Sequence, residues 1–328
     1  VDLGPASAGV PLCCAGAAPR NLPAHQHGQA MGIAWVFPGQ GSQKVGMADQ
    51  VLNVSGANER FALASELLGR DLLAICQGQS GGGDGPDDLN DTRNTQLALF
   101  VVESLLVDNL LKQGREASIV AGHSLGELVA LYAAGVFDLQ TGLSLMKTRS
   151  ELMADAGGGA MTAVIGFDRA QLDELVATTD GVSVANDNSD AQVVISGSPE
   201  AVQTVSGALK CKRAIPLAVS GAFHSPFMAE AAARFSDALD GVTFRDARIP
   251  LLSNSDPTAT TKAESLKQRL KQQMTTGVRW RETMAAMAER GIDTLVEIGP
   301  GNVLSGLAKR SMEGVTTAQI AGAGDLGL

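Results

Sequence analysis

Apolar residues in the first half of the chain occur either as short continuous runs or at the spacing of an amphipathic helix. The runs at 33–37 and 118–121 predict buried strands, and each is followed by a glycine-rich turn. Helical spacing predicts helices over 57–78, 95–112 and 127–134. Repeated strand, turn and helix indicate βαβ units, so the pattern predicts a parallel sheet covered by helices.

The pattern changes between residues 157 and 220. Six shorter elements are expected there in the order β-α-β-β-α-β, which is that of the ferredoxin-like unit. They are the ranges 160–167, 169–178, 182–186, 192–196, 199–209 and 214–219. We therefore expect a small ferredoxin-like subdomain, 157–220, inserted into a larger domain.

The remaining sequence returns to the first pattern. Strands are expected at 250–253 and 294–298, and helices at 262–274, 280–290 and 303–310. The predicted fold class is thus α/β, with a hydrolase-like parallel-sheet domain made of 31–156 and 221–328.

Residues 1–30 follow neither pattern. They are rich in Ala, Gly and Pro, carry almost no charge and show no period. The apolar stretch at 10–15 is compatible with a secretory signal, but a basic start is missing. We interpret 1–30 as a flexible leader, or a segment foreign to the native protein, ahead of a native start at Met31.

Composition excludes several classes of protein. The chain has 328 residues, is 45% hydrophobic and has a formal net charge of -10. Such a chain is neither disordered nor a general nucleic-acid binder. No stretch approaches the ~20 apolar residues of a membrane helix. The four cysteines lack the spacing of a zinc site or a disulfide framework, which favours a reducing compartment: the cytoplasm, or the plastid stroma in a plant or alga.

The sequence GHSLG at 122–126 fits the nucleophile elbow G-x-S-x-G, between an expected strand and an expected helix. A sharp turn there would expose the Ser124 hydroxyl, and the N–H of Leu125 could face a developing oxyanion. The alternative is a glycine-rich turn with a capping serine.

A nucleophilic serine needs a base, and the chain has four histidines. His25 and His27 lie in the leader, and the side chain of His123 should point away from that of its neighbour Ser124. His224 is the remaining candidate, although a lone histidine is often purely structural. An ordinary imidazole pKa of about 6.5 predicts that turnover falls below that pH.

Four motifs together resemble the malonyl-CoA:acyl carrier protein transacylases of dissociated fatty-acid synthesis. They are FPGQGSQ at 37–43, GHSLGE at 122–127, GAFHSP at 221–226 and GPG at 299–301. The resemblance covers residues 33–310. It implies that a malonyl group passes from malonyl-CoA to the phosphopantetheine thiol of acyl carrier protein through a malonyl-serine, for fatty-acid biosynthesis.

The resemblance also implies roles for residues at matching positions. Ser124 would be the acylated nucleophile and His224 its base, oriented by the main-chain carbonyl of Gln273. The backbone N–H groups of Gln40 and Leu125 would form the oxyanion hole.

Further matching positions would bind the substrate. Arg149 would pair with the malonyl carboxylate, for which a guanidinium is suited, although by itself it could be a helix-surface arginine. Gln96, Asn188, Phe223 and His123 would contact the substrate, and Phe223 would crowd an α-methyl branch.

The implied enzyme binds no cofactor and no metal, acts as a monomer, and uses a coenzyme A thioester and an acidic acyl carrier protein as partners. Neither nucleic acid nor membrane is expected as a partner. Three basic clusters could bind the acidic carrier protein or the phosphates of coenzyme A, or could be ordinary solvated faces. They are Lys210/Lys212/Arg213, Lys262/Lys267/Arg269/Lys271 and Lys309/Arg310.

Other classes stay as alternatives. An α/β-hydrolase should have an acidic residue and then a histidine near the C-terminus, but no histidine follows His224. A patatin-like lipase should have an Asp-Gly pair after its serine, but Asp84-Gly85 comes before Ser124, and Asp180-Gly181 is expected at the end of a subdomain helix. A non-catalytic carrier-binding protein should have lost Ser124, His224 or Arg149. An acyltransferase domain of a polyketide synthase is also possible, but no flanking synthase segments are seen.

Overall fold

The computed structural model describes residues 32–79, 88–219 and 221–327. The expected leader at 1–30, with His25 and His27, and the glycine-rich loop at 81–86 lie outside the described residues. All that follows concerns the described part of the chain.

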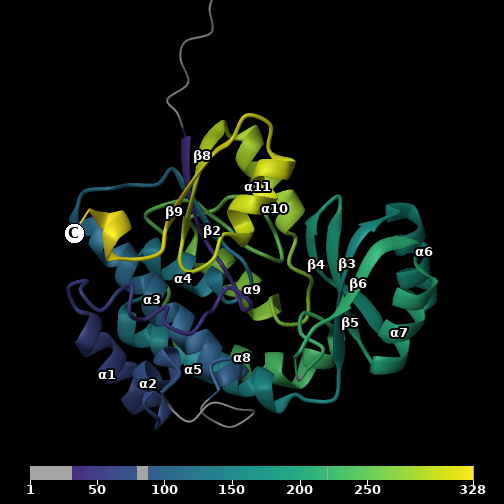
Figure 1. Ribbon diagram of the computed structural model, residues 1–328, viewed down its shortest axis with the longest axis horizontal. Helices are drawn as coiled ribbons and strands as arrows, with labels where there is room; N and C mark the ends of the chain where they lie inside the picture. Colours follow the sequence, from purple (N-terminus) through teal and green to yellow (C-terminus); the bar gives the residue numbers. More distant parts are fainter. Residues whose placement is uncertain (1–31, 80–87, 220, 328) are drawn as a thin grey trace, which may run out of the picture. The chain divides into compact units, whose positions relative to one another are not determined.

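A five-stranded parallel sheet lies at the centre of the larger part of the fold, as the strand and helix pattern predicted (Figure 1). Its order is β7-β2-β1-β8-β9, and each neighbouring pair is parallel. The strands are β1 (Gly32–Phe37), β2 (Ile119–Gly122), β7 (Leu251–Leu252), β8 (Ile292–Ile298) and β9 (Thr316–Ile320).

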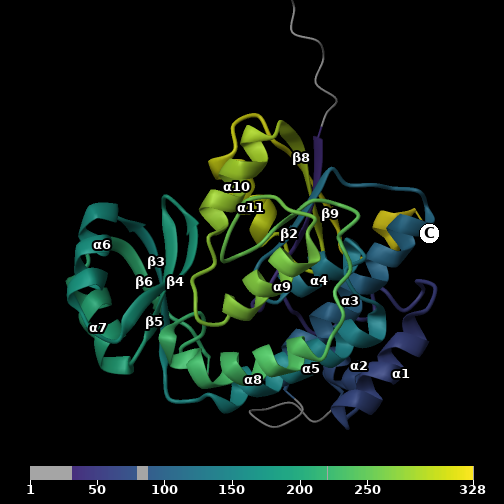
Figure 2. The same cartoon turned by 180° about the vertical axis from the view of Figure 1, so that it is seen from behind.

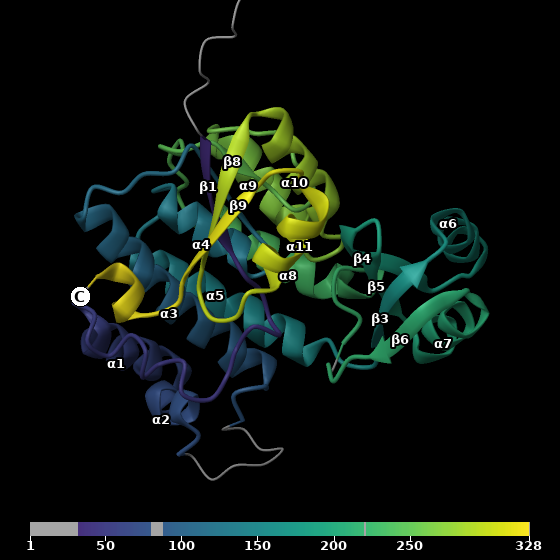
Figure 3. The same ribbon diagram turned by 45° about the horizontal axis from the view of Figure 1, so that its top comes forward.

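Helices cover both faces of this sheet, because alternate side chains of a strand point to opposite sides (Figure 3). Trp35 and Phe37 of β1 pack into the core formed with α1, α3, α4 and α5, whereas Ala34 and Val36 pack into the core formed with α10 and α11. The helices of this part are α1 (Ala57–Leu68), α2 (Leu72–Gln77), α3 (Thr92–Lys112), α4 (Gly126–Ala133), α5 (Leu139–Asp155), α8 (Ala229–Asp240), α9 (Ala263–Gln272), α10 (Trp280–Glu289) and α11 (Val303–Ser311).

A second, antiparallel sheet has the order β4-β5-β3-β6, which is the ferredoxin-like arrangement predicted from the sequence. Two helices cover its side that faces away from the parallel sheet (Figure 2). The elements are β3 (Ala160–Phe167), α6 (Arg169–Thr178), β4 (Val182–Ser189), β5 (Gln192–Gly197), α7 (Pro199–Ala208) and β6 (Cys211–Pro216). The domain boundaries at 157 and 220 stay a prediction.

Strand β4 of the small sheet is joined to the larger part by backbone hydrogen bonds. The N–H of Asp187 donates to the carbonyl of Val278 at 2.9 Å, and the N–H of Val278 donates to the carbonyl of Ala185 at 2.8 Å. The segment before α10 thus extends the edge of the small sheet by an isolated parallel bridge.

Several elements differ from the sequence prediction. The helix expected over 57–78 is two helices, because Gly69 ends α1 in a left-handed conformation with φ 73°. The strand expected over 214–219 is β6, which begins and ends three residues earlier. Helices α5 and α8 and strand β9 were not predicted; two of the four residues that α8 buries are alanines, which give a weak apolar signal.

Within the described ranges, no helix combines the length and the apolar character that crossing a membrane requires.

Two buried carboxyl groups face each other where α3 crosses the parallel sheet. Glu297 of β8 accepts the N–H groups of Leu304 and Ser305 at the start of α11, at 3.1 and 2.8 Å. Glu103 of α3 is fully buried, and neither of its oxygens has a hydrogen-bond partner among the described residues. Burial, and then the charge of Glu297, hold the pKa of Glu103 well above its ordinary value of 4.5.

Glu103→Gln should therefore stabilise the protein at alkaline pH. The folded state binds the Glu103 proton more tightly than the unfolded chain does. The contribution of protonated Glu103 to the free energy of unfolding is therefore complete below pH 4.5, and it is lost as pH rises through the folded-state pKa. We expect the melting temperature of the variant to exceed that of the wild type by a margin that grows with pH. Exposed Glu59→Gln is the control, and a margin independent of pH would contradict the assignment.

Candidate active site

The serine motif forms a sharp turn between β2 and α4. Ser124 has φ 54°, in the left-handed region that a residue with a side chain rarely adopts. Two glycines make room for the turn: a Cβ at Gly122 would lie 1.9 Å from the backbone of Gly126, and a Cβ at Gly126 would lie 2.2 Å from the carbonyl of Phe37. A backbone of this kind costs on the order of 1–3 kcal/mol and persists only where surrounding contacts hold it.

The turn directs the Ser124 hydroxyl at His224. Ser124 Oγ lies 2.7 Å from His224 Nε2, and His224 Nδ1 lies 2.9 Å from the backbone oxygen of Gln273. A carbonyl oxygen can only accept, so Nδ1 carries the proton and Nε2 is left to accept from the serine. The structure thus brings together Ser124 and His224, which the motifs indicated, and the Gln273 carbonyl, which the family resemblance implied.

Burial changes the acid–base properties of His224. Only 3% of this residue is exposed. Desolvation, followed by the nearby charge of Arg149, lowers the pKa of His224 from 6.5 to about 3. The ordinary pKa expected from the sequence is therefore wrong for the folded protein, and the imidazole is neutral at physiological pH.

Arg149 is fully buried on α5 and is not a surface residue. Its NH1 donates to Gln96 Oε1 at 2.6 Å, and its NH2 donates to Gln273 Oε1 at 2.9 Å and to Ser124 Oγ at 3.1 Å. Burial lowers the pKa of Arg149 to about 10, which leaves the guanidinium charged at neutral pH. Lys147, the other basic residue on this part of α5, is part-exposed and pairs with Glu151. Only Arg149 therefore belongs to the site.

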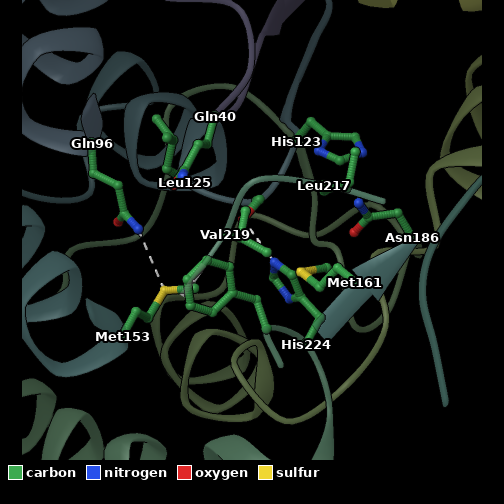
Figure 4. Close-up of a pocket in the computed structure, with 12 residues that line it drawn as sticks. Gln40, Gln96, His123, Leu125, Met153, Met161, Asn186, Leu217, Val219 and His224 are labelled. Atoms are coloured by element: carbon green, nitrogen blue, oxygen red, sulfur yellow. Dashed lines mark hydrogen bonds between the residues drawn. The ribbon is translucent and has the colours of Figure 1, made fainter. Parts of the chain in front are cut away.

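A pocket that is open to solvent lies over the Ser124 and His224 side chains. Figure 4 shows Gln96 and Met153 on one side of it and Asn186 and Met161 on the other. Its lining comprises Gln40, Gln96, His123, Ser124, Leu125, Met153, Met161, Asn186, Leu217, Val219, Phe223 and His224. Within the described part of the chain, the backbone N–H groups of Gln40 and Leu125 donate to no protein acceptor.

Asn188 is placed differently from the sequence expectation. It does not line this pocket; its Oδ1 accepts from His123 Nε2 at 2.8 Å. Asn186, two residues earlier on the same strand, lines the pocket instead. The ring of His123 is hydrogen-bonded to Asn188 and lies 5.5 Å from the ring of Trp280.

Three features of the site escaped sequence reasoning: Asn254, Glu127 and the side chain of Gln273. All three are buried and are joined to the elbow by hydrogen bonds. A signal existed for Asn254, because a polar run follows the strand expected at 250–253. The carboxyl ends of parallel strands meet at one edge of a sheet, where ligand sites form.

No group of three or more His, Cys, Asp or Glu side chains suited to a metal ion is found among residues 32–79, 88–219 and 221–327. The hydroxyl, imidazole and guanidinium groups of the pocket supply a nucleophile, a base and a fixed positive charge. That set is suited to acyl transfer with an acidic acyl group.

Comparison with known proteins agrees with this geometry. The sequence profile of the acyl transferase domain family matches residues 34–325. A malonyl CoA-acyl carrier protein transacylase of Synechocystis sp. is 48% identical over 296 residues, which are 90% of this chain and 99% of the relative. The Escherichia coli protein of the same name is 40% identical over 300 residues, 88% of this chain and 95% of the relative.

Solved structures give the same result. The crystal structure of the Synechocystis transacylase has a TM-score of 0.86, covering 90% of this chain and 99% of that one. A malonyl-transacylase in complex with a type II PKS acyl-carrier protein is 37% identical, with a TM-score of 0.81 and coverage of 90% and 97%. Sequence and fold together establish that the chain belongs to the malonyl-CoA:acyl carrier protein transacylases, a family of acyltransferases.

Proposed function

We propose that the protein transfers a malonyl group from malonyl-CoA to the phosphopantetheine thiol of acyl carrier protein, and so supplies malonyl groups for fatty-acid biosynthesis. One observation carries the proposal: the buried guanidinium of Arg149 lies 3.1 Å from Ser124 Oγ. A cation so close to the nucleophile favours an acyl group that ends in a carboxylate.

The first half-reaction forms a malonyl-serine. Ser124 Oγ attacks the thioester carbonyl carbon while its proton passes to His224 Nε2. The C–S bond then breaks, and coenzyme A leaves as a thiol with the proton that His224 returns. The Gln273 carbonyl keeps the His224 ring in the tautomer that this transfer needs.

The second half-reaction reverses the same steps with a different thiol. The phosphopantetheine thiol gives its proton to His224, and its sulfur attacks the malonyl-serine ester. Ser124 Oγ leaves and takes the proton back. In both halves the tetrahedral oxyanion would accept from the N–H groups of Gln40 and Leu125, which border the pocket and have no protein acceptor among the described residues.

Arg149 is the proposed ligand of the malonyl carboxylate. Its donors are held by amide oxygens of Gln96 and Gln273 and by the serine hydroxyl. A carboxylate accepts charge-assisted hydrogen bonds more strongly than these neutral oxygens. Phe223, which is 5% exposed in the pocket wall, would limit branching next to the thioester.

An acyl carrier protein is the proposed second partner, supported by the relative solved with such a carrier. Of the three basic clusters, the one at 262–271 is largely occupied: Lys262, Arg269 and Lys271 pair with Asp246, Asp256 and Asp240. Lys210, Lys212 and Arg213 are exposed along the β6 edge of the small sheet and have no ion pair among the described residues. Lys309 and Arg310 are also exposed and have no ion pair among the described residues, so these two clusters are better candidates for an acidic partner than the one at 262–271.

We further propose a monomer that uses no bound cofactor and no nucleic-acid or membrane partner. The net charge of -10 supports the absence of nucleic acid. The proposed location is the cytoplasm, or the plastid stroma if the source is a plant or alga.

Incubation with malonyl-CoA in the absence of carrier protein should leave a malonyl group on Ser124. The adduct should persist while malonyl-CoA is in excess, because the only thiol present is the released coenzyme A, which merely regenerates malonyl-CoA. Ser124→Ala should lose the adduct entirely. Intact-mass spectrometry measures the adduct. A hydrolase would release malonate without a stable adduct, and a carrier-binding protein would form none; either outcome rejects the proposed function.

Arg149→Ala should lower kcat/KM for malonyl-CoA by roughly 10- to 150-fold, the equivalent of about 1.5–3 kcal/mol for a charged hydrogen bond. Acetyl-CoA, which has no carboxylate, should lose little. Arg149→Lys should recover only part, because an ammonium cannot form the two-pronged contact. Equal losses for the two thioesters would make Arg149 a structural residue.

The acylation rate of the wild type should stay nearly constant from pH 8 down to about pH 5. Since the pKa of His224 is lowered to about 3, the base becomes protonated only well below the ordinary imidazole range. Single-turnover acylation at each pH measures this, and half-maximal acylation near pH 6.5 would contradict it. His224→Ala should slow acylation by roughly 10²-fold or more at every pH.

A further inference from the structure

Asn254 lies directly beside the nucleophile elbow, two residues beyond the end of β7, the edge strand of the parallel sheet. Strands β2 and β7 pair Val120 with Leu251 and Ala121 with Leu252. Two residues further along each strand, the same register brings Asn254 level with the elbow. Asn254 is 1% exposed, so its amide must find its hydrogen-bond partners inside the protein.

The two ends of this amide bind peptide groups on either side of the turn. Asn254 Oδ1 accepts from the backbone N–H of Ser124 at 2.8 Å, and Asn254 Nδ2 donates to the carbonyl of Gly122 at 2.6 Å. A primary amide offers an acceptor and a donor side by side, which is what these two groups require. The side chain of Asn254 therefore binds the backbone on both sides of His123, the residue that precedes the serine.

Two other buried residues hold this contact in place. Glu127 Oε2 accepts from the backbone N–H of Asn254 at 3.1 Å and from Gln273 Nε2 at 2.7 Å. Gln273 Nε2 also donates to the carbonyl of Ser124 at 2.9 Å. Both peptide groups of Ser124 are thus bound by amide side chains, and Glu127 binds the backbone of Asn254 and the side-chain amide of Gln273.

We propose that Asn254 is a positioning residue that holds Ser124 in its left-handed conformation, with its hydroxyl on His224. The inference rests on the proposed role of Ser124 as nucleophile, and does not depend on which acyl group is carried. Asn254 does not line the pocket, so its effect must reach the substrate through the position of Ser124 Oγ.

Asn254→Ala should slow every reaction of Ser124 by a similar factor. A misplacement of about 1 Å can cost 10²-fold in rate, so we expect a loss of roughly 10²-fold in acylation by malonyl-CoA, by acetyl-CoA and in the return transfer to a thiol. KM should change little. A loss confined to malonyl-CoA would instead indicate carboxylate binding and would overturn the proposal.

A fluorophosphonate probe tests the same point without any thioester. Ser124 Oγ attacks phosphorus, fluoride leaves, and the serine proton passes to His224. The labelling rate of Asn254→Ala should also fall by roughly 10²-fold. This readout survives a failure of the malonyl-transfer proposal, because the probe needs only an activated serine. Labelling within about twofold of the wild type, in a folded variant, would overturn the proposal.

Asn254→Asp gives a second test through pH. When protonated, an aspartic acid can still accept from the Ser124 N–H and donate to the Gly122 carbonyl; when ionised, it presents an oxygen to that carbonyl and repels it. Labelling of this variant should therefore rise as pH falls from 8 to 5, whereas the wild type stays nearly flat. A profile parallel to that of the wild type would overturn the proposal, even if Asn254→Ala does not fold.

Asn109→Asp is the matched control. Asn109 is also buried, and its Nδ2 donates to the carbonyl of Leu105 at 2.9 Å within α3. The substitution should lower the melting temperature and leave both the labelling rate and its pH profile as in the wild type. The same pH-dependent labelling in Asn109→Asp would mean that a general loss of stability explains both variants, and would overturn the proposal.

Discussion

The buried charge of Arg149 is the constraint around which the site is organised. A guanidinium removed from water is strongly destabilising unless its donors are satisfied and a counter-charge is near. Gln96 and Gln273 supply the acceptors, and the carboxylate of Glu127 raises the pKa of Arg149 against the effect of burial. Desolvation in turn raises the pKa of Glu127 above its ordinary value. Each of these two charges thus depends on the other.

Gln273 connects this charge to the rest of the site. Its carbonyl accepts from His224, its Oε1 accepts from Arg149, and its Nε2 donates to Glu127 and to Ser124. Groups joined through one residue do not contribute independently. Double substitutions among Ser124, His224 and Arg149 should therefore be interpreted as changes to one network.

Local sequence patterns were enough to predict those parts of the fold that follow from hydrophobic periodicity and from glycine-rich turns. The strand–turn–helix order gave the parallel sheet and the elbow, and the β-α-β-β-α-β order gave the small sheet. Arg149 needed the resemblance, because its own sequence context could not distinguish a buried charge from a surface one. The polar run after the strand expected at 250–253 pointed to that edge of the sheet, but the contacts of Asn254 and of the Gln273 side chain could not be foreseen, since their partners lie 130 and 149 residues away in the chain. Only the register of β2 and β7 brings Asn254 to the serine.

The backbone bridge between β4 and Val278 has a consequence for how a long pantetheine arm can be exchanged. Strand β4 carries Asn188, whose oxygen holds the ring of His123, the residue next to the serine. If the two sheets moved apart as rigid bodies, the Asn188–His123 hydrogen bond would transmit the movement to the elbow. An arm that enters and leaves while this bridge stays closed needs rotamer changes of buried wall residues such as Met153 and Met161, whose unbranched side chains can adopt several shapes. The frame around the serine would then stay fixed from one substrate to the next.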